Sequence, residues 1–434
     1  MSHPLFAPEH KFEPYWIEDA PWPILPETTL PAETDVAVVG AGYTGLAAAL
    51  TLAREGRGVV VLDAGQAGFG CSSRNGGQCG AGLKPGLDEL SARYGRERAL
   101  AMYREGLASL EFLAGFIERE RIECDFIRPG RFIGAHRPEH YETLARDCET
   151  LRRELGVECH AVPRGEQHGE IGSDIYYGGA VKPNHAALQP ALYHHGLLDR
   201  TLAAGVRVMA HTPVTRIARS GAGFELTTPQ GRLAAGNVIV ATNGYTRDHA
   251  ALPALRRRVI PIGSYMIATE PLDPAIIERL MPKNRVLNDT RRVVLYFRAS
   301  PDRRRVVFGG RVALAETDPA LSGPKLHAIM TTIFPELAQV RITHSWMGFV
   351  AFTFDHLPHI GVHDGLHYAM GYCGSGVAMG TYLGHKAALK VLGAPEGHTA
   401  FDGLVFETRP LYDGTPWFLA GAVAWYRLLD RFGR

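Results

Sequence analysis

The sequence has little of what would define several classes of protein. It holds six cysteines and no CxxC pair, so neither a structural zinc site nor a thioredoxin-type motif is spelled out. The formal net charge is only +1, which argues against a nucleic-acid partner or a polybasic membrane contact. No run reaches the roughly 18 apolar residues that a membrane span needs. None of the 19 histidines stands in HExxH or another metal-binding spacing, so no metal is predicted.

The two ends of the chain add further exclusions. The first residues, MSHPLFAPEHKFEPYW, contain neither an apolar core nor a cleavage-like stretch of small residues. With the cysteines scattered, we expect free thiols in a reducing compartment and a cytoplasmic protein. The stretch FLAGAVAWYRLL near the C-terminus is interrupted by Arg427. It predicts an amphipathic helix that docks on the protein, with contact at a membrane surface as the alternative.

Glycine, in contrast, is abundant, at 49 of 434 residues, where average usage is about 7%. Residues 35–63 read as an apolar strand (DVAVV), a helix (TGLAAALTLAREG) and a second apolar strand (VVVLD). Their combined length is close to the roughly 30 residues of a βαβ unit. Both strands are apolar on both faces, as strands of a parallel sheet covered by helices must be.

The turn inside this unit, GAGYTG, predicts a dinucleotide site. Gly40 suits the tight turn, a side chain on Gly42 would occupy the space of a pyrophosphate, and Gly45 permits close packing of helix and strand. The helix N-terminus offers N–H groups and a partial positive charge to phosphates. Asp63 follows Gly45 by 18 residues, near the ~20 expected of a carboxylate that binds a ribose.

Two further glycine-rich stretches favour a flavin over a nicotinamide. The first, AGQAGFGCSSRNGGQ, directly follows Asp63 and can contact a ring that lies over the sheet. The second, GYCGSGVAMG, stands between a strand and a helix but has no ribose acid after it. A helix N-terminus there could stabilise negative charge at the pyrimidine edge of the flavin. One dinucleotide, FAD, is therefore expected.

The remaining chain divides by its periodicity. Residues 87–155 show apolar positions at helical spacing, and short strands resume near residue 203. Residues 259–349 alternate short strands with turns rich in proline and charge, which predicts an antiparallel sheet.

These motifs, together with NVIVATNGYT and FTFDHLPHIG, resemble the D-amino-acid-oxidase-like FAD oxidoreductases, and most closely the γ-glutamylputrescine oxidoreductase branch, from about residue 35 to residue 392. The resemblance implies an α/β fold in which a Rossmann-type FAD-binding domain is interleaved with a substrate domain of antiparallel β-sheet plus helices. The expected division is an extended N-terminal segment (1–34), a discontinuous FAD-binding domain (35–86, 172–255 and 350–400), a substrate domain (87–171 and 256–349) and a C-terminal docking segment (401–434).

The resemblance also implies which residues contact FAD. The pyrophosphate turn is formed by Gly40, Gly42, Tyr43, Thr44 and Gly45, and the adenosine side by Asp63 and Ala64. The loop that contacts the flavin, called the flavin loop, contains Ser73, Arg74, Asn75, Gly76 and Gln78. Val214 is expected at the adenine; a second contact with the adenosine half comes from Thr242, Asn243 and Gly244; and the pyrimidine edge of the flavin is lined by Gly374, Gly376, Val377 and Met379.

FAD is expected to be bound without a covalent link. The position where some relatives attach the flavin through a cysteine corresponds to Gly348, and residues 64–84 contain no histidine. Cys71 and Cys79 remain possible attachment points.

The implied reaction is oxidation of a C–H bond next to an amine nitrogen, with O2 or another acceptor taking the electrons. A polyamine derivative such as γ-glutamylputrescine is the expected substrate, and a D-amino acid or N-methyl amino acid is the alternative. A flavin-binding subunit without catalysis is a distant alternative. A flavin disulfide reductase would need a second nucleotide fingerprint and a cysteine pair, and neither is present. The substrate-side candidates are Tyr265, Tyr296, Arg298, Arg311 and Trp346.

Overall fold

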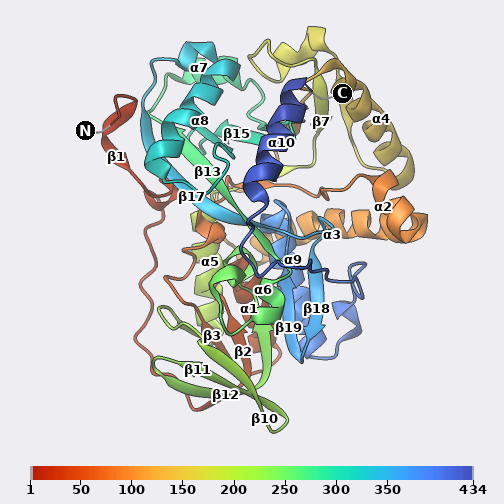
Figure 1. Ribbon diagram of the computed structural model, residues 1–434. Helices are drawn as coiled ribbons and strands as arrows, with labels where there is room; N and C mark the ends of the chain where they lie inside the picture. Colours follow the sequence, from red (N-terminus) through yellow and green to blue (C-terminus); the bar gives the residue numbers. More distant parts are fainter. Residues whose placement is uncertain (1–2, 433–434) are drawn as a thin grey trace.

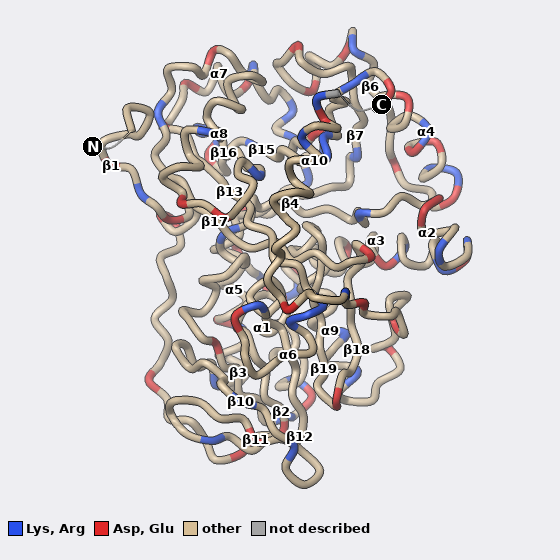
Figure 2. Tube along the Cα trace, viewed as in Figure 1, with Lys and Arg blue, Asp and Glu red and all other residues tan. Residues whose placement is uncertain are grey.

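The computed structural model describes residues 3–432 and contains two large β-sheets, one above the other in Figure 1. The lower sheet has eight strands and the upper one nine. This is the predicted interleaved α/β arrangement. Lys and Arg are interspersed with Asp and Glu over both parts of the chain (Figure 2), as the net charge of +1 suggests.

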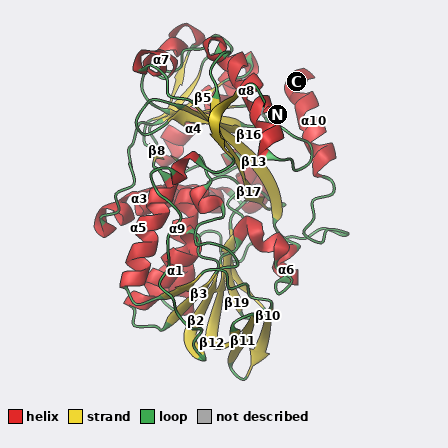
Figure 3. Ribbon diagram, turned by 90° about the vertical axis from the view of Figure 1, so that its left-hand side faces the viewer, coloured by secondary structure: helices red, strands yellow, loops and turns green. Residues whose placement is uncertain are grey.

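The eight-stranded sheet has a parallel core that is buried on both faces. In β2, Val36 and Val38 pack against helices α1, α5 and α9, while Ala37 and Val39 pack on the other face against the β10–β11–β12 hairpins. Figure 3 shows these three helices on one side of the sheet. The apolar second half of β2, residues 36–39, follows from this two-sided burial.

The elements of this part are β2 (Glu33–Val39), α1 (Tyr43–Arg54), β3 (Val59–Leu62), α5 (Pro190–Ala203), β9 (Arg207–Met209), β10 (Arg216–Ser220), β11 (Gly223–Thr228), β12 (Gly231–Val240), β18 (His359–His363), β19 (Leu366–Met370) and α9 (Gly376–Val391). The strand order is β10-β11-β12-β2-β3-β9, with β19 beside β12 and β18 beside β19.

The nine-stranded sheet has two chemically different faces. One face carries Phe132, Leu287, Phe297 and Phe308, which form a core with helices α7 and α8. The opposite face, called the polar face below, carries polar side chains beside the apolar Met266, Val307 and Trp346, and it lies toward the eight-stranded sheet. The strand order of the nine-stranded sheet is β1-β17-β13-β16-β15-β14-β5-β7-β6. The strands within residues 259–349 pair antiparallel, as predicted.

The elements of this part are β1 (Phe6–Lys11), α2 (Leu87–Tyr94), α3 (Arg96–Glu120), β5 (Arg131–Gly134), α4 (Pro138–Leu155), β6 (His160–Val162), β7 (Gly179–Lys182), β13 (Ile260–Thr269), α7 (Pro274–Leu280), β14 (Val286–Asp289), β15 (Leu295–Ala299), β16 (Val306–Gly310), α8 (Pro319–Ile333) and β17 (Ile342–Phe352). Strands β4 (Gln78–Cys79) and β8 (Ala186–Ala187) form a separate two-stranded sheet, and α6 (Pro253–Arg256) is a short helix.

Two segments lie in a different part from the one that the sequence indicated. Strand β1, inside the N-terminal segment expected to be merely extended, pairs with β17 of the nine-stranded sheet. Strand β7, placed by sequence in the FAD-binding domain, pairs with β5 of the same sheet. The boundary expected at residue 172 therefore falls after β7, because strand pairing over this range is not encoded locally.

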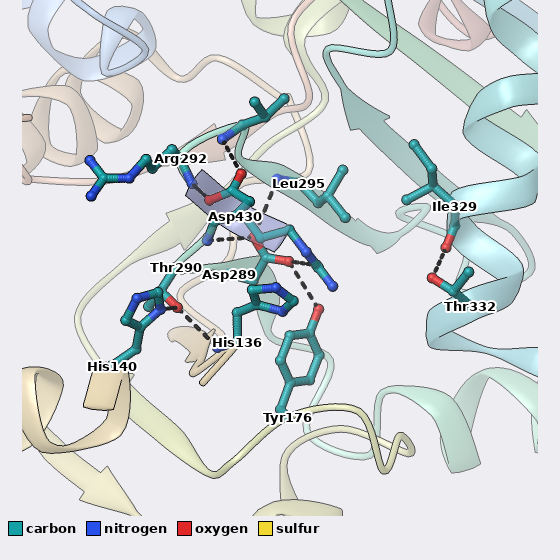
Figure 4. Close-up of polar contacts among 12 residues, drawn as sticks. His136, His140, Tyr176, Asp289, Thr290, Arg292, Leu295, Ile329, Thr332 and Asp430 are labelled. Carbon is teal, nitrogen blue, oxygen red and sulfur yellow. Dashed lines mark hydrogen bonds and ion pairs between the residues drawn. The ribbon is translucent and has the colours of Figure 1, made fainter. Parts of the chain in front are cut away.

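The C-terminal helix α10 (Leu419–Phe432) is held against the nine-stranded sheet through its end (Figure 4). The Asp430 carboxylate accepts hydrogen bonds from the backbone N–H groups of Arg292 and Val293, at 2.9 and 3.1 Å. Arg137 donates to the Asp430 carbonyl oxygen at 2.6 Å. No helix within residues 3–432 is long and apolar enough to cross a membrane.

The expectation that all six cysteines are free thiols is wrong for two of them. Cys148, in α4, and Cys159, just before β6, form a disulfide with their Cα atoms 5.1 Å apart. Sequence spacing did not reveal the pair because the packing of α4 beside β6 brings the two residues together.

We therefore expect a thiol titration of the denatured, unreduced protein to count four reactive thiols, those of Cys71, Cys79, Cys124 and Cys373. The same titration after reduction should count six. A count of six without reductant would contradict the disulfide.

Candidate FAD and substrate site

Four of the segments singled out in the sequence meet at one edge of the eight-stranded sheet. The GAGYTG turn follows β2, Asp63 follows β3, Thr242 to Gly244 follow β12, and the second glycine turn follows β19. These four strands are parallel, so their carboxyl ends lie side by side. In open α/β sheets this edge is where ligands bind.

The first turn has the geometry that a pyrophosphate needs. Gly40 has φ +108°, and a Cβ there would lie 2.9 Å from the Ala241 carbonyl oxygen. A Cβ on Gly45 would overlap the carbonyl oxygen of Gly40, so this glycine sets the close contact of α1 with β2. On Gly42 a Cβ would meet only Ser72 Oγ, at 2.9 Å. The space over Gly42 is thus a cradle that a side chain would fill.

Asp63 is fixed by the backbone of the same turn. Its carboxylate accepts hydrogen bonds from the N–H groups of Ala41, at 2.7 Å, and Gly65, at 2.9 Å. Burial raises the pKa of this carboxyl, and the two backbone donors oppose that rise. Ala64 beside it is exposed, and Val214 is buried after β9.

The loop that follows β3 is tied to the first turn and braced internally. Ser72 Oγ accepts from the Tyr43 backbone N–H at 3.1 Å, and the Tyr43 hydroxyl donates to the Pro190 carbonyl at 2.9 Å. Asn75 donates to the Cys71 carbonyl at 2.9 Å and accepts from Gly77 N–H at 2.8 Å. The loop is therefore preorganised by its own side chains.

Not every polar residue of this loop is directed to the strand ends. Ser73 is buried, and the Arg74 guanidinium lies 4.2 Å from the Phe69 ring centroid, with its Nε donating to the Phe69 carbonyl at 2.7 Å. Burial lowers the pKa of Arg74. Gln78 donates to the carbonyl of Phe297 at 3.1 Å and so joins the loop to β15.

The second glycine turn is joined to the first through α1 and β12. The Tyr372 hydroxyl and Thr44 Oγ1 are 2.7 Å apart, and Asn243 Oδ1 accepts from Gly371 N–H at 2.9 Å. Gly374 has φ +101° and open space where a Cβ would stand. The backbone at this turn, ahead of α9, is thus accessible to a ligand.

Other residues expected to contact FAD, at the pyrimidine edge or at the adenosine half, are structural in their contacts. Val377 and Met379 are buried in the core between α1 and α9, and Thr242 Oγ1 bonds Thr246 Oγ1 at 2.6 Å. A Cβ on Gly244 would lie 2.7 Å from the Phe349 carbonyl oxygen. At these positions only the backbone can serve a ligand.

Taken together, the open space at Gly42 and Gly374, the braced carboxylate of Asp63 and the helix N-terminus of α1 suit an FAD. The turn and helix would hold the pyrophosphate, Asp63 the ribose, and the loop with the Gly374 turn the flavin ring.

The polar face of the nine-stranded sheet covers the flavin loop. Tyr296 on β15 lies close to Gly76, where a Cβ would come within 3.1 Å of the tyrosine ring. Its hydroxyl is 2.7 Å from Ser264 Oγ, and burial raises its pKa to about 12. Tyr296 is therefore a protonated hydroxyl at neutral pH, suited to orient a substrate.

The other substrate-side candidates have partners elsewhere. Tyr265 lies in the core on the opposite face, and its hydroxyl donates to Glu316 at 2.9 Å. Arg311 forms an ion pair with Glu316 at 3.1 Å. Trp346 donates to the Arg74 carbonyl at 2.9 Å, and Arg298 donates to the Gly77 and Leu188 carbonyls at 3.1 and 2.9 Å. Trp346 and Arg298 therefore hold the flavin loop against the nine-stranded sheet.

Sequence reasoning missed the polar residues that share the face of Tyr296. They are Arg131, Lys182, Ser264 and Asn288, on four different strands. In the sequence each of them is a single polar or basic residue within or beside a short apolar run. That feature assigns the residue to a face of the sheet only once the pairing of the strands is known. Within residues 3–432 no three His, Cys, Asp or Glu side chains are grouped to hold a metal ion.

Comparisons with known proteins agree with this geometry. The family model described as "DAO: FAD dependent oxidoreductase" matches residues 35–389. The chain is 33% identical to gamma-glutamylputrescine oxidoreductase of Escherichia coli over 412 residues, covering 92% of this chain and 93% of that one. It is 29% identical to the probable oxidoreductase OrdL of Haemophilus influenzae, covering 94% of each chain.

Among solved structures, glycine oxidase from Geobacillus kaustophilus superimposes with a TM-score of 0.73 at 21% identity, covering 88% of this chain and 99% of that one. L-proline dehydrogenase from P. horikoshii gives a TM-score of 0.68 at 19% identity, covering 91% and 99%. At these identities the likeness describes the fold.

Proposed function

Because the chain belongs to the DAO family of FAD-dependent oxidoreductases, which act on CH–NH bonds, we propose that it oxidises a polyamine derivative such as γ-glutamylputrescine. The observation that carries the proposal is the meeting of four strand-end segments beneath a sheet face that bears Tyr296. The 33% identity to the Escherichia coli gamma-glutamylputrescine oxidoreductase supports this substrate class.

The reaction removes a hydride and a proton from a C–H and its amine nitrogen, and the resulting imine takes up water to give an aldehyde or keto product and an amine. FAD, when bound, accepts the hydride, and O2 or another acceptor restores it. The chain supplies binding and orientation: the Gly42 turn for the pyrophosphate, Asp63 for the ribose, and Tyr296 for the substrate. Since the Tyr296 pKa is about 12, its hydroxyl keeps its proton and does not act as the base.

An anaerobic bleaching screen tests the proposal. The yellow holoprotein is mixed without oxygen with γ-glutamylputrescine, putrescine, D-amino acids and N-methyl amino acids at equal concentrations. The colour should fade fastest with γ-glutamylputrescine. Faster fading with a D-amino acid or an N-methyl amino acid would overturn the substrate class, and no fading with any amine would overturn the reaction.

We further propose that the FAD is not covalently attached. Position 348 is glycine, and the thiol nearest to it, Cys71, donates to the Phe349 carbonyl. Burial raises the pKa of both Cys71 and Cys79 to about 12, so their reactive thiolates are scarce at neutral pH. Acid precipitation should leave all flavin in the supernatant. A yellow washed pellet would contradict this, and a Cys71→Ser protein would then identify the attachment point.

A further inference from the structure

Two basic side chains face each other across neighbouring strands on the polar face of the nine-stranded sheet. Arg131, the first residue of β5, and Lys182, the last residue of β7, are directly paired in the antiparallel register. Paired residues of antiparallel strands project their side chains to the same face, with Cα atoms about 5 Å apart. The sheet therefore concentrates two positive charges at one point.

This point is joined to Tyr296 by an oblique row of side chains, from Tyr296 through Asn288 and Arg131 to Lys182, because Arg131 pairs with Val286, two residues before Asn288. Asn288 pairs with Tyr296 between β14 and β15, and Asn288 Oδ1 accepts a hydrogen bond from the Arg131 guanidinium at 3.2 Å. The strand order β15-β14-β5-β7 places Tyr296 and Lys182 three strands apart. At about 4.8 Å per strand and about 7 Å for the two-residue offset along the strands, the backbones at the two ends of the row are about 16 Å apart.

The row follows the flavin loop. A Cβ on Gly76 would come within 3.1 Å of the Tyr296 ring, and one on Gly80 would come within 3.2 Å of Arg131 Nη2 and 3.0 Å of His185 Nδ1. The loop thus passes Tyr296 at its Gly76 end and the basic pair at its Gly80 end. A ligand lying along the loop would meet both.

The basic pair lacks a matching acid among the described residues. Arg131 Nε and His185 Nδ1 are buried without hydrogen-bond partners. The charged and titratable groups that act on the pair are Cys79, which is neutral, and Asp147, which faces Lys182 from α4 without forming an ion pair within residues 3–432. Burial lowers the pKa of Arg131 to about 10 and that of Lys182 from its usual value.

Unpaired buried cations are unfavourable, and an anion that bonds them relieves the cost. His185 adds no positive charge, because burial and the two neighbouring cations hold its pKa well below the usual value. An arginine fork beside a lysine suits a carboxylate, which accepts two parallel hydrogen bonds.

We propose that Arg131 and Lys182 bind a carboxylate at the end of the substrate remote from the oxidised amine. The proposal rests on the proposed function and narrows it. In an α-amino acid the carboxylate is one bond from the oxidised carbon, too close to span the row. The geometry instead fits an amine whose carboxylate stands many bonds away, since an extended chain covers about 3.5 Å for every three bonds.

The test compares two substrates on three proteins. N-glutarylputrescine carries the distant carboxylate, and N-acetylputrescine lacks it. For Arg131→Gln and for Lys182→Gln we expect kcat/KM with the glutaryl compound to fall about 100-fold, as for loss of one partner of a buried charge pair. With the acetyl compound it should change less than about threefold. Arg303→Gln, at the exposed turn between β15 and β16, is the control and should change neither.

An equal fall in kcat/KM with both substrates would overturn the proposal. Loss of bound FAD from the folded variants would also overturn it, because the two cations would then bind the cofactor. If no amine bleaches the protein, the proposed function has failed. Calorimetry with glutarate then tests the anion site independently of the reaction. Glutarate binding that disappears in Lys182→Gln would then support the anion site, and no binding to the unsubstituted protein would overturn it. Thermal unfolding establishes that each variant is folded.

Discussion

The Gly42→Val protein is expected to emerge from purification colourless. Gly42 stands at the N-terminus of α1 with extended backbone, φ −86° and ψ −175°, so valine is compatible with the backbone itself. Its side chain would instead fill the cradle above the turn and press on Ser72. Overpacking of this kind costs about 1–3 kcal/mol, and at the upper end weakens FAD binding about 100-fold. The ratio of flavin to protein absorbance measures the loss.

Gly86→Val is the matched control. Gly86 also precedes a helix, α2, with a similar backbone of φ −68° and ψ 161°, and a Cβ there meets no atom within 4 Å. This protein should keep its full colour. A Gly42→Val protein as yellow as the control would show that the turn does not hold the cofactor.

Flavin reduction should accelerate with pH by about tenfold per unit below the pKa of the bound substrate amine. The nitrogen lone pair must be free as the C–H bond breaks, so only the neutral amine reacts. A free alkyl amine has a pKa near ~10.4, and burial in the site lowers it. Tyr296, with its pKa about 12, stays protonated across this range and cannot produce the rise. Anaerobic stopped-flow measurements with amines of different basicity follow the effect.

Two tyrosine variants separate orientation from proton transfer. Tyr296→Phe should slow reduction or weaken binding while the pH profile still follows the substrate. Tyr265→Phe, on the opposite face of the sheet, should leave both rate and profile unchanged. A profile that is the same for all amines and disappears in Tyr296→Phe would make that hydroxyl the general base.

The dinucleotide half of the fold was predictable because its signals are local. The strand, turn and helix around Gly40, Gly42 and Gly45 lie within a few residues of one another, and each glycine has a steric reason that the sequence alone suggests. The acid at Asp63 follows at the expected distance. The structure adds that this carboxylate is already bonded to two backbone N–H groups, which no spacing rule contains.

The substrate side could not be read in the same way. Which face of a strand a residue occupies depends on its register with a partner, and a shift of one residue reverses the face. Tyr265 and Tyr296 are both aromatic residues on antiparallel strands, yet one packs under α8 and the other faces the flavin loop. Arg131 and Lys182 are 51 positions apart and meet only because β5 and β7 pair.

The alternation of the chain between its two sheets has a consequence for how the protein is made. The parallel strand β3 ends at Leu62, but β19 begins 304 residues later, at Leu366. At about 5–20 residues per second, roughly 15–60 s of synthesis separate them. During that time the β2–α1–β3 unit emerges without β19 and α9, which supply the second glycine turn. Binding of a ligand that needs both glycine turns therefore follows emergence of nearly the whole chain, and until then the edge of β12 that pairs with β19 is uncovered.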